Sequence, residues 1–249
     1  MSQIASEATE NQIHPEIAEM FKAGVHFGYR KTKRHPNMRS FIFGTKNNVE
    51  VFDLAKVYSK MEEALAFVKK LGEEGKAILL VGTKASAREA IKATAERLGM
   101  PYVSERWLGG TLTNFKVLSD RVAHWLGLEH MKISGEIKKY TKQEQVRISK
   151  EITKLDRTFG GLRLLKKLPA AVLVVDISEE RIAVAEARKR KVPVIAISSS
   201  DTNPDLASYP IPANDNSKSS IAYLLMRIEA AYREGEELRV ASQAANIEA

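Results

Sequence analysis

The chain has 249 residues, 44% of them hydrophobic, and a formal net charge of +8. It contains no cysteine, which excludes disulfide bonds, thiolate catalysis and cysteine-ligated metal sites. No apolar run approaches the roughly 18 residues that a membrane-spanning helix needs, and the acidic N-terminus lacks the features of a signal or transit peptide. We therefore expect a cytoplasmic protein with an ample hydrophobic core and no membrane partner.

Apolar runs alternate with amphipathic stretches through most of the chain. In chain order, the expected strands are Val49–Phe52 and residues 76–81, 171–176 and 192–197. The expected helices span residues 54–71, 85–98, 179–190 and 216–233. Runs of Val, Ile and Leu that are apolar on both faces are typical of parallel strands buried between helices. We therefore predict an α/β fold, a parallel sheet with helices on both faces in a flavodoxin- or Rossmann-like three-layer arrangement.

The stretch at residues 113–167 breaks this alternation and predicts two long helices joined near Tyr140. In the second helix, apolar residues recur at spacings of four and three, at Ile148, Ile152, Leu155, Phe159 and Leu162. The first helix has the same spacing at Leu118, Val122 and Trp125. Because this is the spacing of a coiled-coil seam, we predict an antiparallel helical hairpin.

The chain thus divides into four expected parts. The α/β core comprises residues 13–112 and 168–233, and the coiled-coil arm is an insertion at residues 113–167. Polar or Glu- and Ala-rich ends predict flexible tails at residues 1–12 and 234–249, the second of which could equally be a frayed helix.

Positive charge is concentrated in two segments. Residues 20–49 contain seven Lys or Arg and no Asp or Glu, and residues 131–167 contain eleven basic and four acidic residues. Such clusters attract polyanions, because each phosphate contact releases a condensed counterion. A solvated basic face without a partner is the alternative for either segment alone. Two dense segments favour nucleic acid.

The candidate RNA contacts of the first segment are Lys22, His26, Arg30, Lys31, Lys33, Arg34, His35, Arg39 and Lys46. The two histidines either stack on bases or bind phosphate, or else pack in the ordinary way. The candidate contacts of the arm, with RNA or a neighbouring protein, are Lys138, Lys139, Lys142, Arg147, Lys150, Lys154 and Arg157.

Two turns carry further candidates. Residues 105–115 read ERWLGGTLTNF, and here Arg106, Trp107 and Asn114 are candidate RNA contacts, although Trp107 is equally suited to packing under a loop. Gly82-Thr83-Lys84 follows an expected strand and opens a helix, so this turn suits a phosphate. Lys84 is therefore a candidate RNA contact, and the alternative is a nucleotide- or sugar-phosphate-binding enzyme.

Catalytic and metal-binding patterns are weak. The sequence has neither a P-loop nor a G-x-G-x-x-G motif, and its five histidines show no metal-ligand spacing. Asp176 and Asp201 follow expected strands, where α/β enzymes often place carboxylates, but Asp176 is as well placed to cap a helix. We expect no enzyme, no cofactor and no metal.

From about residue 17 to residue 232, the chain resembles the bacterial family of the second protein of the small ribosomal subunit. The segments that carry the resemblance lie at residues 23–56 (AGVHFGYRKTKRHPNMRSFIFGTKNNVEVFDLAK), 81–91 (VGTKASAREAI), 100–115 (MPYVSERWLGGTLTNF), 168–197 (LPAAVLVVDISEERIAVAEARKRKVPVIAI) and 203–215 (NPDLASYPIPAND). Departures from the family's usual pattern occur at Tyr29, Ala170, Ser199-Ser200-Asp201, Ala213 and Asn216-Ser217.

The resemblance implies an α/β sheet with a protruding coiled-coil arm, placed between the head and body of the small subunit. It implies binding to small-subunit ribosomal RNA, late entry into assembly, and contact with neighbouring ribosomal proteins, including the largest one, which captures messenger RNA. No enzymatic step, small-molecule substrate or homo-oligomer is implied. A further hypothesis is a coiled-coil scaffold whose arm docks only protein.

Overall fold

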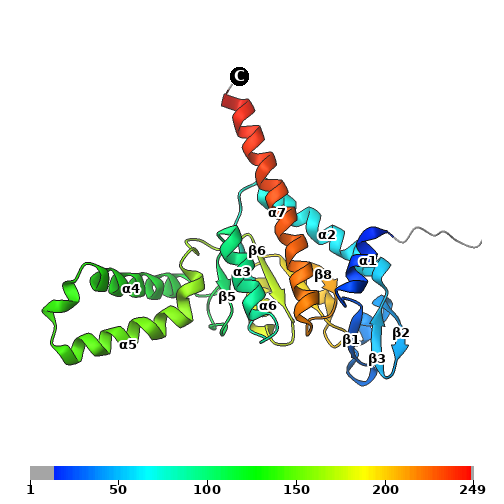
Figure 1. The fold of residues 1–249 in the computed structure, drawn as a ribbon, viewed down its shortest axis with the longest axis horizontal. Helices are drawn as coiled ribbons and strands as arrows, with labels where there is room; N and C mark the ends of the chain where they lie inside the picture. Colours follow the sequence, from blue (N-terminus) through cyan, green and yellow to red (C-terminus); the bar gives the residue numbers. More distant parts are fainter. Residues whose placement is uncertain (1–13, 248–249) are drawn as a thin grey trace, which may run out of the picture.

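Figure 1 shows the computed structural model, which describes residues 14–247 as an elongated molecule built around an α/β core. The arm projects from one end of the long axis, and a small antiparallel sheet lies at the opposite end (Figure 1). The predicted tail at residues 1–12 lies outside the described residues.

The core sheet has five parallel strands in the order β5-β4-β6-β7-β8. These strands are β4 (Ile78–Val81), β5 (Tyr102–Val103), β6 (Ala171–Val175), β7 (Val194–Ser198) and β8 (Tyr209–Pro212). The order is that of flavodoxin-like folds, in which the chain reverses its direction of travel at a switch point, here between β4 and β6. The predicted parallel sheet is confirmed.

Helices cover both faces of this sheet. They are α2 (Leu54–Glu73), α3 (Arg88–Leu98), α6 (Arg181–Lys189) and α7 (Lys218–Ile247), and α1 (Pro15–Lys22) packs against α2. Successive side chains of β4 alternate between two cores: Ile78 and Leu80 pack with α2, α3 and α7, whereas Leu79 and Val81 pack with α6 and the base of the arm. The expected three layers follow from strands that are apolar on both faces.

The strand predicted at Val49–Phe52 exists but does not belong to the parallel sheet, so that assignment is wrong. It is β3, the central strand of an antiparallel sheet with β1 (Phe27–Arg30) and β2 (Ile42–Lys46). Asn47 and Asn48, with φ of 49° and 62°, form the loop between β2 and β3. A two-residue loop of this kind joins antiparallel strands, whereas parallel neighbours need a long crossover.

Two long helices lie where the helical hairpin was predicted. They are α4 (Phe115–Ile133) and α5 (Lys142–Phe159), joined by the short helix η3 (Glu136–Lys139). Apolar seam residues are buried at Leu118, Trp125, Ile152, Phe159 and Leu162. A capping box between Thr141 and Glu144 fixes the start of α5.

The last helix is longer than expected, because α7 continues from the predicted end at residue 233 to Ile247. It crosses α2 at two glycines: a Cβ on Gly72 would clash with the Tyr232 carbonyl oxygen, and one on Gly235 with that of Lys69. Beyond this crossing α7 projects away from the core (Figure 1). Two short edge strands, β5 and β8, were not expected; β8 contains Pro210 and Pro212, which weaken a strand signal.

Candidate nucleic-acid interface

The first basic segment folds on the outside of the core as β1, η1 (Lys31–Lys33), η2 (Pro36–Phe41) and β2. Six of its cations are exposed and, among residues 14–247, have no Asp or Glu within ion-pair distance: Lys22, Arg30, Lys31, Lys33, Arg39 and Lys46. Arg34 differs, because its guanidinium lies 3.3 Å from the buried Glu50 carboxylate and its side chain is 25% exposed. The segment therefore presents a cluster of free cations around one structural ion pair.

Residues 29–35, which we call the basic loop, are attached to the core at both ends by Ser200. The backbone N–H of Tyr29 donates to Ser200 Oγ (2.9 Å), and that of His35 donates to the Ser200 carbonyl oxygen (2.8 Å). The Tyr29 hydroxyl donates to Asn216 Oδ1 (3.2 Å). Tyr29, Ser200 and Asn216 thus meet at this end of the basic loop.

Two predicted stacking residues are not available to a base. His26 is 7% exposed between the rings of Phe21 and Phe27, whose centroids lie 4.4 and 4.0 Å away, and burial lowers its pKa. Trp107 is 8% exposed and its indole N–H donates to Glu186. The packing alternative therefore holds for both, and we remove them from the interface. His35 is half-buried, and its Nδ1 accepts from the backbone of Asn37.

The turn at Gly82-Thr83-Lys84 lies at the switch point, but its groups already have partners within the protein. The Lys84 ammonium contacts Asp176 (2.9 Å), Asp215 (3.1 Å) and the Tyr29 hydroxyl (3.2 Å). Burial alone lowers the pKa of Lys84, but the two carboxylates raise it overall. Lys84 is therefore an internal cation rather than an RNA contact.

Two backbone N–H groups of this turn also have partners within the protein. The N–H of Gly82 donates to the Val103 carbonyl oxygen (3.0 Å), and that of Thr83 to the buried Glu180 carboxylate (2.6 Å). A Cβ on Gly82 would approach Ile91 of α3 to 2.8 Å, so the glycine permits close packing. A phosphate here would lack the N–H groups of Gly82 and Thr83 and the Lys84 ammonium as free donors, and it would face buried carboxylates.

Burial raises the pKa of Asp215 to about 7, and the nearby charge of Asp176 acts in the same direction. The Lys84 ammonium lowers it only in part, because one cation serves two carboxylates. Asp176 has φ of 72°, and its Oδ1 accepts from the backbone of Ser178 (2.9 Å), so it closes the turn before α6, whose N-cap is Glu180 rather than Asp176. Asp201 is half-buried nearby, and burial raises its pKa.

The arm carries its predicted cations on its surface. All seven are exposed, namely Lys138, Lys139, Lys142, Arg147, Lys150, Lys154 and Arg157. Among residues 14–247, only Arg157 of these seven has an acidic partner: its guanidinium contacts the Glu105 carboxylate of the core (3.0 Å). Arg157 thus ties α5 to the core, while the other six remain available to a partner.

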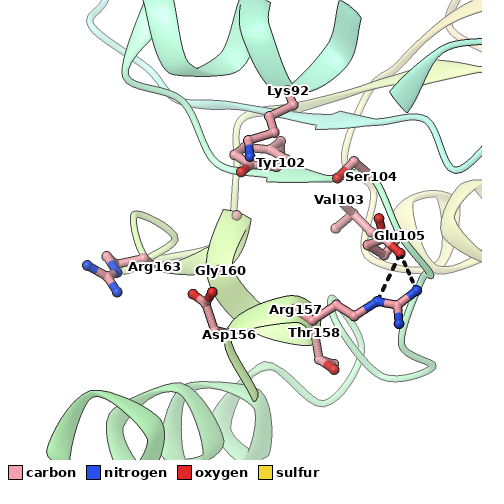
Figure 2. Close-up of a pocket in the computed structure, with 11 residues that line it drawn as sticks. Lys92, Tyr102, Val103, Ser104, Glu105, Asp156, Arg157, Thr158, Gly160 and Arg163 are labelled. Carbon is pink, nitrogen blue, oxygen red and sulfur yellow. Dashed lines mark hydrogen bonds and ion pairs between the residues drawn. The ribbon is translucent and has the colours of Figure 1, made fainter. Parts of the chain in front are cut away.

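Figure 2 shows the pocket of about 420 Å³ at the base of the arm, between the edge of the core sheet and the end of α5. Glu105 and Arg157 face each other across one wall of it, and Asp156 and Tyr102 line other parts. A Cβ on Gly161 would clash with the Tyr102 carbonyl oxygen, so the glycine lets the arm pack directly against the sheet edge.

A single buried carboxylate holds the loop that leads into the arm. Glu186 of α6 accepts from the Trp107 indole and from the backbone of Gly110, Leu112 and Thr113, at 2.6 to 3.2 Å. The Thr113 hydroxyl is a fifth donor (3.1 Å). Burial alone raises the pKa of Glu186, but these donors lower it overall.

The remaining candidates of this loop, Arg106 and Asn114, are exposed. The hydrogen bonds by which Glu186 and Ser200 hold the two loops that carry these candidates were not predicted from the sequence. Neither stands in a motif; Glu186 interrupts the small apolar face of α6, which is the one local sign of its role.

Comparison with known proteins assigns the chain to a family. The family model described as ribosomal protein S2 matches residues 20–235. A small ribosomal subunit protein uS2 from Thermus thermophilus is 44% identical over 85% of this chain and 82% of its own length. Proteins of the same name from Rhodococcus opacus and Dictyoglomus thermophilum are 43% and 41% identical, over 90% and 91% of this chain and 77% and 92% of their own lengths. The chain belongs to the ribosomal protein S2 family.

Members of the S2 family are ribosomal proteins rather than enzymes, so the phosphate-binding enzyme considered above is wrong for this chain. The occupied switch-point turn gives the physical reason. The family also agrees with the cytoplasmic location expected from the sequence, since bacterial ribosomes lie in the cytoplasm.

The sequence of this S2 family member predicts neither a membrane-spanning helix nor a metal site. Within residues 14–247, no helix has the length and apolar character required to cross a membrane. The same range holds no group of three His, Cys, Asp or Glu side chains suited to a metal ion.

Proposed function

We propose that this chain is a structural component of the small ribosomal subunit that binds ribosomal RNA through two separate basic surfaces. The observation that carries the proposal is the group of exposed cations around residues 22–46, which lack carboxylate partners within the described residues. Surface cations are usually balanced by nearby acids, and a group that is not balanced favours a polyanion.

The basic loop is the centre of the first surface. Arg30, Lys31 and Lys33 are exposed within four residues of one another, which suits contacts with successive phosphates. Phosphate contacts position a protein on RNA without reading its sequence. Recognition of RNA shape and a steep dependence on salt are therefore expected.

The arm forms the second surface. Its six free cations lie on α5 or on η3 just before it, at the end of the molecule opposite the basic loop (Figure 1). Ile133 and Val146 are 85% and 56% exposed near the tip, a feature that favours a protein neighbour there. We propose RNA along the basic face of the arm and a ribosomal protein at its tip.

Finer roles rest on the family resemblance. We propose that the chain enters assembly late and supports the largest small-subunit protein, which captures messenger RNA. The C-terminal part of α7 is the favoured place for a protein neighbour, because it is acidic in sequence and exposes the apolar side chains of Leu238 and Val240.

The test measures binding of the full-length protein to small subunits that lack it, over a range of salt concentrations. One variant replaces Arg30, Lys31, Lys33 and Arg39 by Ala. Arg34 is retained, since its loss would leave Glu50 buried and unpaired. The control variant replaces four exposed cations outside both segments by Ala, namely Lys70, Lys76, Lys92 and Lys218, the last three of which pair with acids.

Each phosphate contact contributes about 0.7 to 0.9 to the slope of log K against log salt, so the first variant is expected to flatten the slope by about 3. The control loses the same net charge and should change the slope by less than about 1. Equal slopes for both variants and the unmodified protein would refute the first surface.

A further inference from the structure

We propose that Ser200 is a positioning residue that holds the basic loop in its RNA-binding shape. The site at which this fold binds ligands would then serve as the attachment point for the chain's own RNA-binding segment. The inference rests on the proposed function, because it assigns the loop's geometry to RNA binding. Ser200 itself does not touch RNA, since its side chain is fully buried.

One residue, Ser200, binds both ends of the basic loop. Ser200 accepts from the N–H of Tyr29 through its hydroxyl (2.9 Å) and from the N–H of His35 through its carbonyl oxygen (2.8 Å). Arg30, Lys31, Lys33 and Arg34 all lie between these two bonds. The ends of the loop are thereby held to a single point of the core.

There is no free space between β1 and Ser200. A Cβ on Gly28 would lie 2.9 Å from Ser200 Oγ, so only glycine lets β1 approach this closely. The loop has a further backbone bond, from Lys31 N–H to the Asn48 carbonyl oxygen (3.0 Å). The loop is thus pinned at its two ends and near its middle.

The Tyr29 end of the basic loop lies at the switch point of the core sheet. In doubly wound folds, ligands bind at the carboxyl ends of the strands where the strand order reverses. Here the Tyr29 side chain lies at that place, with its hydroxyl bonded to Lys84 and Asn216. The chain's own β1 and basic loop therefore occupy the position of a ligand.

The positive charges of the basic loop also affect its shape. Four like charges in a short loop repel one another, which disfavours a compact loop unless other bonds hold it. Asp176 and Asp215 lie at the same edge, but the Lys84 ammonium contacts both. These two acids consequently do not pair with Arg30, Lys31 or Lys33, which stay available to a partner, whereas Arg34 pairs with Glu50.

The test compares two buried serines. Ser200→Ala removes the acceptor for Tyr29 and leaves the backbone bond to His35. Ser198→Ala is the control, since Ser198 is fully buried and its hydroxyl has no hydrogen-bond partner within the described residues. Tyr29→Phe is a second variant, which removes the hydroxyl contacts and keeps both bonds to Ser200. Binding to small subunits that lack the protein is measured over a range of salt concentrations. The conditions are ones in which unfolding curves show that each variant is fully folded.

One lost hydrogen bond with an orphaned donor is expected to weaken binding by about 5- to 30-fold for Ser200→Ala. The salt slope should stay unchanged, because no phosphate contact is removed. Amide exchange at Tyr29 should accelerate in the free protein. Tyr29→Phe should weaken binding less, and Ser198→Ala should not.

The outcomes separate this inference from the proposed function. If Ser200→Ala and Ser198→Ala bind equally well while the Arg30/Lys31/Lys33/Arg39 variant loses affinity, the loop binds RNA without being positioned by Ser200. If that charge variant also binds normally, the first RNA surface itself is wrong. A purely structural role would lower the unfolding free energy of Ser200→Ala and leave the affinity of the folded protein intact, which would also overturn the inference.

Discussion

The carboxylate of Glu186 offers the sharpest test of how the arm is attached to the core. The proposed change is Glu186→Gln, which keeps the size of the side chain and removes its charge. The carboxylate receives five hydrogen bonds, four of them from the backbone and indole N–H groups of the loop that leads into α4. The carboxamide keeps one accepting oxygen and turns an NH₂ group toward donors on the other side.

The expected loss follows from the groups that would be orphaned. If the oxygen of the amide stays on Gly110, the N–H groups of Leu112 and Thr113 lose their acceptor. A buried donor without a partner costs about 1 to 3 kcal/mol, so Glu186→Gln should lower the free energy of unfolding by about 3 kcal/mol. Urea unfolding near neutral pH measures this loss.

Acid adds a second readout. The pKa of Glu186 in the folded protein is lower than in the unfolded chain, where it is about 4.3. Its carboxylate therefore stabilises the protein fully above that pH, and this contribution is lost as pH falls through the folded pKa. The Gln variant should lack that component of the acid sensitivity.

The control for this prediction is Glu179→Gln, because the Glu179 side chain is exposed and accepts no hydrogen bond within residues 14–247. It should unfold within about 0.5 kcal/mol of the unmodified protein, as most surface substitutions do. If Glu186→Gln behaved in the same way, the five bonds would not hold the loop, and our account of the arm's attachment would fail.

Two further predictions concern packing and charge in the core. Gly235→Ala should destabilise the protein by about 2 kcal/mol, because overpacking forces α7 away from α2. Gly127→Ala in the exposed part of α4 should instead stabilise it by about 0.5 to 1 kcal/mol. Thermal unfolding measures both changes in stability, and changes of the same sign would contradict the close crossing of α7 and α2. Asp215 has a folded pKa of about 7, above that of the unfolded chain, so its contribution to stability declines as pH rises from about 4 to 7. Asp215→Asn should flatten this part of the stability profile by up to about 1.4 kcal/mol per pH unit, as measured by urea unfolding at a series of pH values, and an unaltered profile would show that Asp215 is ionised throughout.

The parallel sheet was predictable because its strands are local signals. Residues 171–175 form an unbroken run of Ala, Val and Leu, and all five side chains are buried. The seam of the arm was likewise readable from spacing, and Trp125 is fully buried as expected of a seam residue. Such patterns report burial along one element and need no knowledge of its neighbours.

Partner choice over long sequence distances was not predictable. Lys84 looked like a free cation because the second carboxylate that binds it, Asp215, lies 131 positions away. Trp107 was suited both to stacking and to packing, and only its contact with Glu186, 79 positions away, decides between them. For Val49–Phe52, the apolar pattern predicted a strand correctly but carried no information on which sheet it joins.

The placement of the two basic surfaces at opposite ends of the molecule has a kinetic consequence (Figure 1). With α5 alone about 27 Å long at 1.5 Å per residue, the arm and the basic loop cannot hold the same short stretch of RNA. Each end would instead bind its own RNA strand, and while one end is bound the other remains close to its site at a high effective concentration. Dissociation would then require both ends to detach at the same time, so modest affinity at each end would be enough for a long residence time. If both proposed surfaces bind RNA, a chain of this shape would link two RNA segments rather than cover one.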